Sequence, residues 1–239
     1  MTNKILIATA TYNEIENISK LINSIQNLNL DLHFLVIDDN SPDKTYIILE
    51  NFKKKFKKRF NYILRKEKLG LDTAHKEIYK YAQKNKFDYL ITIDADLSHN
   101  PRTITKIVKY LKYYDFVIGS RYIKNGKNRM KSSRLFLSKY GNLLIGKIMN
   151  SKIKEHTTSY RGFNLHNLSK KKFNFTLIKS KGYSFFMETI YHLRKNKCSI
   201  KEVPIIFKDR ENGVSKIPKF ELFRTLFNLF NLKIRDFFY

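Results

Sequence analysis

The chain has 239 residues, of which 42% are hydrophobic, so it is long enough and apolar enough to fold around a core. This composition excludes global disorder, and the single cysteine, Cys198, excludes an internal disulfide. The formal net charge of +26 suits nucleic acid, an anionic membrane surface or a phosphorylated substrate, so charge alone does not select the partner.

The first half of the chain alternates short apolar runs with segments of helical periodicity. The runs at 5–10, 34–37, 62–64, 91–94 and 116–119 predict buried strands. Between them, apolar residues recur every three or four positions, which predicts helices. This alternation is typical of an α/β fold with a mostly parallel sheet and helices on its faces.

Polar side chains follow the predicted strands, and two of them are carboxylates one residue apart. If the strand extends to this point, Asp94 and Asp96 point to the same side of it. Two hard oxygen ligands at a strand end suit Mg²⁺ or Mn²⁺. The alternative is an aspartate-rich turn in which Asn100 and Pro101 begin the next helix.

A ligand of such a sheet is expected at the carboxyl ends of the strands. The chain has neither a GxGxxG nor a GxxxxGK[ST] motif, which counts against a dinucleotide or P-loop phosphate site. Carboxylates and a metal would therefore handle a diphosphate instead. The polar residues that reach this edge are Tyr12, Asn13 and Glu14, then Asp38 and Asp39, then Asp94 and Asp96, then Ser120 and Arg121.

The second half of the chain is different, because it contains two amphipathic segments rich in lysine. Helices are predicted over 134–149 and over 218–239, and the second would carry Phe220, Phe223, Phe227 and Phe230 on one side. Thr225 falls on the opposite, polar side. Aromatic residues beside basic flanks favour a membrane surface, and the alternative is a terminal helix packed on the core. No signal peptide and no apolar run of about 20 residues is visible.

Nine sequence blocks, in order, resemble the dolichyl-phosphate mannosyltransferases, which are inverting family 2 glycosyltransferases of GT-A fold. The resemblance runs from about residue 5 to residue 216. It implies a GT-A domain, which we place at 1–217, and the amphipathic segment over 218–239 is then expected to be the membrane-interfacial helix. The blocks are TYNE (11–14), DDNSPD (38–43), KLGL (68–71), DADLSH (94–99), GSRY (119–122), TTSYR (157–161), SKGY (180–183), EVP (202–204) and RENGVSK (210–216).

The resemblance implies a role for each matched position. Asp94, Asp96 and Ser98 would meet the metal, Mg²⁺ or Mn²⁺. Arg121, Arg134 and Ser138 would receive the phosphate of the acceptor lipid. Asp96, Arg121 and Arg210 would be the catalytic residues. The nucleotide-sugar donor would contact Ala10, Tyr12, Glu14, Ile37, Asp39, Asp94, Ala95, Asp96, Arg121, Arg210 and Lys216.

The implied reaction transfers mannose from GDP-mannose to a polyprenyl phosphate with inversion. Relatives that attack hydroxyl groups carry a Glu-Asp pair near residue 188, where this chain has Glu188 and Thr189. A phosphate acceptor needs no general base, so this difference favours a lipid phosphate. Glu188 could also simply brace a helix. Lys44 stands where the relatives have a turn with Asp-Gly, so a lysine falls at a position that favours positive φ.

Three alternatives remain open at this point. The enzyme could use another nucleotide sugar such as UDP-glucose, or a hydroxyl acceptor. The net positive charge would also suit a nucleic-acid-binding module. The sequence has no RNP, KH, zinc-finger or helix-turn-helix signature, so no nucleic-acid partner is expected. A non-catalytic membrane adaptor could have kept the fold. We expect a peripheral protein on the cytoplasmic face of a membrane, for which small membrane-anchoring subunits are conceivable partners.

Overall fold

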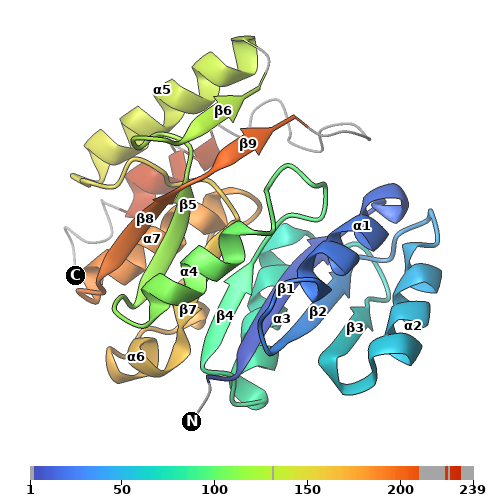
Figure 1. Ribbon diagram of the computed structural model, residues 1–239. Coiled ribbons are helices and arrows are strands. Elements are labelled where there is room, and N and C mark those ends of the chain that lie inside the picture. The colour runs from blue at the N-terminus through green and yellow to red at the C-terminus, as the bar shows by residue number, and fades with distance from the viewer. Residues whose placement is uncertain (1–2, 131, 210–223, 226, 233–239) are drawn as a thin grey trace.

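The computed structural model describes residues 3–130, 132–209, 224–225 and 227–232, without the side chains of 132–134. Its centre is a seven-stranded sheet with the strand order β3-β2-β1-β4-β7-β5-β8 (Figure 1). Only β7 runs antiparallel to its neighbours β4 and β5 in this sheet. The strands are β1 (Ile5–Thr11), β2 (Leu32–Asp38), β3 (Phe60–Leu64), β4 (Tyr89–Thr92), β5 (Phe116–Ser120), β7 (Arg161–Asn164) and β8 (Ile200–Pro204). The predicted α/β fold with a mostly parallel sheet is confirmed.

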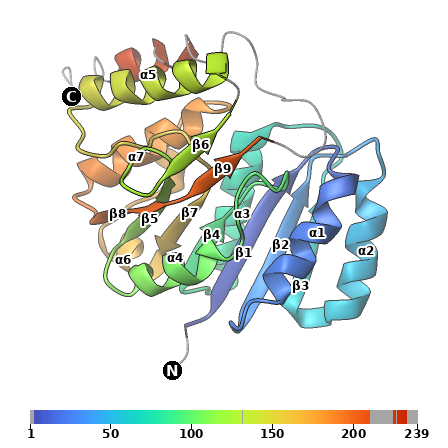
Figure 2. The same cartoon turned by 45° about the horizontal axis from the view of Figure 1, so that its top comes forward.

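Helices cover both faces of the sheet, as Figures 1 and 2 show. On one face, α1 (Ile15–Gln26), α2 (Thr45–Phe56) and α4 (Thr103–Leu111) bury their apolar residues against the strands. On the other face, α3 (Leu71–Lys84), α6 (Leu165–Lys170) and α7 (Ser184–Lys195) do the same. The apolar spacing read from the sequence therefore becomes two hydrophobic cores separated by one sheet.

Above the sheet, a two-stranded ribbon and one long helix form a separate layer. Strands β6 (Lys127–Arg129) and β9 (Ile206–Lys208) pair in parallel, and α5 (Ser132–Ile148) runs beside them (Figure 2). Short 3₁₀ turns occur at Lys57–Arg59 and Phe175–Leu177. In the described part of the chain, we find no helix with the length and apolar character needed to cross a bilayer.

The described residues of the predicted C-terminal helix, 224–225 and 227–232, are helical. Leu229 and Leu232 are buried in the core that also contains residues of α5 and α7. Thr225, which we expected on the solvent side, is buried and lies 3.2 Å from the Ser184 hydroxyl. That expectation was wrong because positions 225, 229 and 232 share one helical face, and this face packs on the protein. Phe227 and Phe230 are 65% and 61% exposed.

Two local features bear on the sequence analysis. Lys44 precedes α2 with φ at 62°, so the lysine does occupy the left-handed conformation that the turn requires. Strand β4 ends at Thr92, two residues earlier than expected, and Asp96 lies in a turn that precedes Leu97 with φ at 61°. The two aspartates are therefore held by turn geometry rather than by the alternation of an extended strand.

Two buried histidines should make the fold sensitive to acid. His75 in α3 lies against the edge of Phe186, with ring centroids 4.9 Å apart. His156 is fully buried, and neither ring nitrogen has a hydrogen-bond partner among the described residues. Burial lowers the pKa of each imidazole from 6.5 to about 4.

We predict that the free energy of unfolding falls by about 2 kcal/mol per histidine between pH 6.5 and about 5. The unfolded chain takes up a proton near pH 6.5, whereas the folded protein does so only near pH 4. Stability is therefore complete above pH 6.5 and is lost as the pH falls. Urea denaturation at a series of pH values measures this slope. His156→Gln should flatten it and His166→Gln, at an exposed position, should not; an equal slope in both variants would contradict the assignment.

Candidate active site

The polar side chains predicted to meet at one edge of the sheet do come together there. Strands β1, β2 and β4 are parallel neighbours, and β5 runs in the same direction, so their carboxyl ends share one edge. Arg121, directly after β5, lies close enough to Asp94, after β4, for the two charges to interact. The edge thus combines carboxylates with a guanidinium, which suits a phosphorylated ligand.

The two carboxylates at the end of β2 have different tasks. Asp38 is fully buried and accepts hydrogen bonds from Thr11 (2.8 Å) and from the Ser41 hydroxyl (2.6 Å). Asp39 is engaged with the loop after β3: it accepts from the backbone amides of Leu69 (2.9 Å) and Gly70 (2.8 Å). The carboxylate predicted to hold the nucleoside therefore also fixes the loop beside it.

Arg65 completes this arrangement, and the sequence analysis did not single it out. Its Nη1 donates to Asp39 at 3.0 Å, and its Nε and Nη2 donate to Glu77 in α3. The loop held in this way carries Lys68, whose ammonium lies 3.8 Å from the centre of the Tyr12 ring. Tyr12 and Lys68 thus lie side by side at this edge of the sheet, where a nucleobase could stack on the ring or accept a hydrogen bond from the ammonium group.

The predicted metal ligands lie in one turn. Asp96 is 5% exposed, and its Oδ1 accepts from the backbone amide of Ser98 at 3.1 Å. The Ser98 hydroxyl is buried and has no hydrogen-bond partner in the described part of the chain. A buried oxygen without a partner beside two carboxylates fits a hard divalent cation. The described residues contain no group of three or more acidic, histidine or cysteine side chains that could hold a metal, so diphosphate or water would complete the coordination.

His99 orients the first of these carboxylates, a contact that the sequence analysis did not predict. Its Nε2 lies 3.3 Å from Asp94 Oδ2, and its ring is packed against Tyr160 and Phe207. Burial would raise the pKa of Asp94, but the hydrogen bond and charge of His99 outweigh burial and lower it to about 2. Asp94 is therefore ionised at neutral pH. The backbone amide of Lys208 also donates to Ser98 (3.1 Å), which ties β9 to the same turn.

Arg121 is buried and already paired. Its Nε and Nη2 each donate to Glu155 at 2.7 Å, and Nη2 also donates to Thr157 at 2.8 Å. Burial would lower the pKa of the guanidinium, but the Glu155 charge raises it above the ordinary value. The fork that was predicted to receive a phosphate is therefore occupied by a carboxylate, which leaves Nη1 without a hydrogen bond to the described residues.

Other predicted site residues have varied positions. Ser138 in α5 shares a hydrogen bond of 2.6 Å with the Tyr122 hydroxyl. Ile37 and Ala95 are buried in the two cores, and Ala10 packs against the first. Glu14 is nearly buried and accepts from Asn17 at 2.9 Å. Arg210 and Lys216 lie outside the described residues, as does the side chain of Arg134.

Glu188 is committed to structure. It is 1% exposed and accepts from the backbone amides of Lys179 (3.1 Å) and Ser180 (2.6 Å), while His192 lies 3.4 Å away. Burial would raise its pKa, but these hydrogen bonds lower it to about 2. Thr189, in the position of the missing second acid, donates to the carbonyl of Phe185. Glu188 therefore braces the start of α7 and is poorly suited to take a proton at neutral pH.

Comparison with known proteins identifies a family and several relatives of this chain. Residues 6–170 match the family described as Glycosyl transferase family 2. The chain is 30% identical to the polyprenol monophosphomannose synthase of Mycolicibacterium smegmatis, over 98% of this chain and 88% of the relative. It is 31% identical to the dolichol-phosphate mannosyltransferase of Pyrococcus furiosus, over 96% of this chain but only 63% of that relative.

Among solved structures, the fold resembles glucosyl-3-phosphoglycerate synthase from Mycobacterium tuberculosis, which was crystallised with Mn²⁺, UDP and glucosyl-3-phosphoglycerate. The TM-score is 0.67 at 16% identity, and the match covers 95% of this chain and 80% of that one. At this identity the resemblance concerns the fold alone.

The pairing of Arg121 with Glu155 generates a prediction. Glu155→Gln keeps the shape of the side chain but removes the charge, which leaves a buried guanidinium without its counter-ion. We expect the free energy of unfolding to fall by about 3 kcal/mol, measured by urea denaturation at neutral pH. The matched control is Glu16→Gln, at an exposed position of α1. Equal stability of the two variants would contradict a structural role for Glu155.

Proposed function

The chain belongs to glycosyl transferase family 2, and from this we propose that it transfers mannose from GDP-mannose to a polyprenyl phosphate with inversion. The similarity to the polyprenol and dolichol-phosphate mannose enzymes extends over nearly the whole chain. This similarity supports a polyprenyl phosphate as acceptor over the acceptors of other family 2 enzymes. The guanine nucleotide and the cytoplasmic side of the membrane are parts of the proposal.

One observation carries the choice of acceptor: near residue 188, where relatives that attack hydroxyl groups carry a Glu-Asp pair, this chain has no acid that is poised as a general base. Glu188 is ionised, buried and fully hydrogen-bonded, and Thr189 replaces a second acid. A hydroxyl acceptor would need a base to remove its proton. A phosphate monoester is already an oxyanion at neutral pH, so it can attack the anomeric carbon from the side opposite the leaving diphosphate without one.

Asp94, Asp96 and Ser98 would hold Mg²⁺ or Mn²⁺, as the buried unpartnered hydroxyl of Ser98 and the two carboxylates suggest. A divalent cation bound there supplies Lewis-acid stabilisation of the negative charge that develops on the leaving nucleoside diphosphate. His99 would keep Asp94 ionised and oriented toward that site.

The remaining roles follow from the geometry of the edge. Tyr12, Glu14 and Asp39 would hold the nucleoside, with Asp39 acting partly through the loop that carries Lys68. Ala10, Ile37 and Ala95 would shape the pocket from within the core. Arg121 would offer its Nη1 to the acceptor phosphate, together with Arg134 and Ser138. Arg210 and Lys216 would add positive charge near the donor diphosphate.

We further propose that residues 1–217 form the catalytic domain and that 218–239 contact the membrane surface peripherally. Exposed apolar side chains support this contact. On α5 they are Phe136, Leu137, Tyr140, Leu143 and Leu144. Phe227 and Phe230 add two more exposed rings, and they belong to the red C-terminal segment whose ribbon lies beside α5 in Figures 1 and 2. Small membrane-anchoring subunits would be compatible partners, and nucleic acid would not be a partner.

A donor and acceptor screen tests the proposal. Purified protein with Mn²⁺ is incubated with GDP-mannose or UDP-glucose, and with a polyprenyl phosphate or the corresponding polyprenol. We expect a lipid-linked sugar only from GDP-mannose and the phosphate. The alternative is a family 2 enzyme that uses another nucleotide sugar or a hydroxyl acceptor. Product only from UDP-glucose, or only from the polyprenol, would replace the proposed reaction by that alternative.

Substitution of Asp96 tests the metal assignment. Asp96→Asn should lower kcat by at least about 100-fold, because stabilisation of the leaving diphosphate is worth several kcal/mol. The affinity of the variant for Mn²⁺ in the presence of GDP, measured by titration calorimetry, should fall together with kcat. Asp31→Asn, an exposed carboxylate at the start of β2, is the control and should retain activity. Normal turnover of Asp96→Asn would rule out its role.

A further inference from the structure

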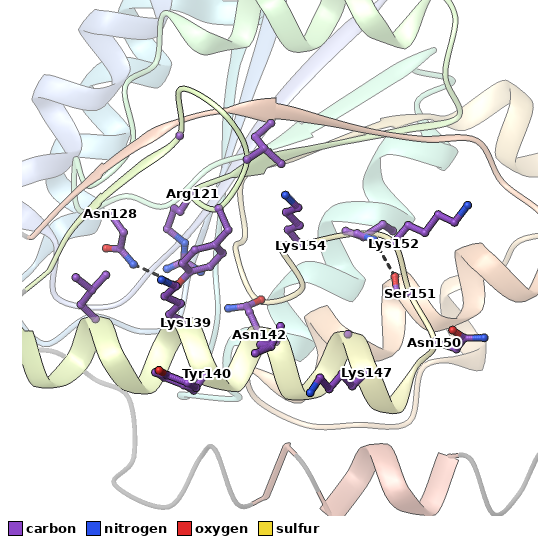
Figure 3. A pocket seen from close by; sticks show the side chains of 17 residues that line it. Arg121, Asn128, Lys139, Tyr140, Asn142, Lys147, Asn150, Ser151, Lys152 and Lys154 are labelled. Atoms are coloured by element: carbon purple, nitrogen blue, oxygen red, sulfur yellow. Dashed lines mark hydrogen bonds between the residues drawn. The ribbon is translucent and has the colours of Figure 1, made fainter.

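A cavity of about 880 Å³ lies between α5, the residues after β5 and the loop that follows α5 (Figure 3). Arg121, Asn128 and Lys139 lie toward one end of it, whereas Lys147, Ser151 and Lys152 lie toward the other. The first end adjoins the active site, because Arg121 directly follows β5 at the catalytic edge. The second end has no role in the reaction described above.

The lining of the cavity is strongly cationic. It contains five basic side chains, Arg121, Lys139, Lys147, Lys152 and Lys154, and no acidic one. Arg121 is neutralised by Glu155. The four lysines are exposed, and none forms an ion pair with any residue that the structure describes. Four ammonium groups around one cavity, none of them paired with a described carboxylate, favour an anionic ligand.

The same cavity has an apolar side. Leu135, Tyr140 and Leu143 of α5 line it, and Tyr140 and Leu143 are 53% and 55% exposed. They are continuous with the exposed Phe136, Leu137 and Leu144 on the same helix. A ligand that matches both parts carries a phosphate on an apolar chain, and the cavity opens where such chains would lie if α5 rests on a bilayer.

A single phosphate cannot satisfy both ends. Lys139 and Lys147 are eight positions apart on α5, which separates them by about 12 Å along the helix axis. The acceptor phosphate must reach the sugar at the catalytic edge, so it needs the Arg121 end. At the other end, the carbonyls of Met149 and Asn150 already accept hydrogen bonds from Arg194 (2.6 and 2.7 Å). This pairing limits the negative potential of the α5 C-terminus there.

We propose that the distal end, formed by Lys147, Ser151 and Lys152, binds the phosphate of an anionic phospholipid of the bilayer. The proposal rests on the proposed function, because the acceptor is assigned to the Arg121 end. A bilayer lipid held here would set the angle of α5 on the membrane and keep the neighbouring mouth of the cavity open to the acceptor.

The test is binding of the full chain to vesicles without donor or acceptor. Wild-type protein should prefer phosphatidylcholine vesicles with about one third phosphatidylglycerol over phosphatidylcholine alone. Lys147→Gln/Lys152→Gln should weaken binding to the anionic vesicles by about 25-fold, since each lysine near an anionic leaflet contributes about a fivefold factor. Flotation of the vesicles measures the partition, and thermal unfolding verifies that the variant is folded.

The matched control removes the same charge elsewhere. Lys57 and Lys58 follow α2, far from α5 in Figure 1, so Lys57→Gln/Lys58→Gln should change binding by less than about threefold. An equal loss in both double variants would mean that net charge alone drives binding, and would overturn the proposal. No preference of the wild type for anionic vesicles would do the same.

A second arm separates the two sources of phosphate. Phosphatidylcholine vesicles that contain a low mole fraction of polyprenyl phosphate as their only anionic lipid should bind wild type and Lys147→Gln/Lys152→Gln equally well. If the double variant loses this binding as well, the distal end serves the acceptor and the proposal is wrong. Because no sugar transfer is measured in either arm, failure of the proposed reaction would be seen separately, in the donor screen.

Discussion

The arrangement of the active site depends on a buried guanidinium that has no carboxylate partner. Arg161 in β7 is 1% exposed and forms no ion pair within the described part of the chain. Its charge is satisfied by backbone carbonyls, which accept at 2.6 Å (Thr158), 2.8 Å (Phe186) and 3.0 Å (His156). Burial lowers its pKa to about 9, so it stays protonated at neutral pH. A buried charge is costly to leave unsatisfied, so these carbonyls must remain in place.

The consequence reaches the catalytic edge. Two of the three carbonyls belong to the segment before β7, and that segment also carries Glu155, which pairs with Arg121. The third belongs to α7, whose first turns are braced by Glu188. One antiparallel strand thus fixes both the guanidinium of Arg121 and the helix that carries Glu188. The positions of Arg121 and Glu188, on which the proposed reaction depends, therefore result from packing around Arg161.

The sequence indicated the fold and the catalytic edge well, because both follow from local patterns. Apolar runs predict the strands, and regular apolar spacing predicts the helices. The parallel arrangement then brings the carboxyl ends of the strands to one edge of the sheet. β7 escaped prediction because four residues that include Arg161 and Gly162 do not resemble a central strand. Its position comes from a cation held by distant carbonyls. Likewise, nothing local links Asp39 to Arg65, and Thr225 is buried because its helix packs on the protein beside Ser184.

The basic residues of this chain fall into two classes with different uses. Arg65, Arg121 and Arg161 are buried, and carboxylates or carbonyls occupy most of their donors, so their charge serves mainly the architecture, and Arg121 keeps only Nη1 for the proposed acceptor phosphate. Lysines such as Lys147 and Lys152 are exposed and unpaired within the described residues. A planar, rigid fork suits fixed partners, whereas a flexible ammonium adapts to a mobile one. The net charge of +26 is therefore available to outside anions mainly through lysine, and a fluid lipid surface is the anionic partner that such flexible charges match best.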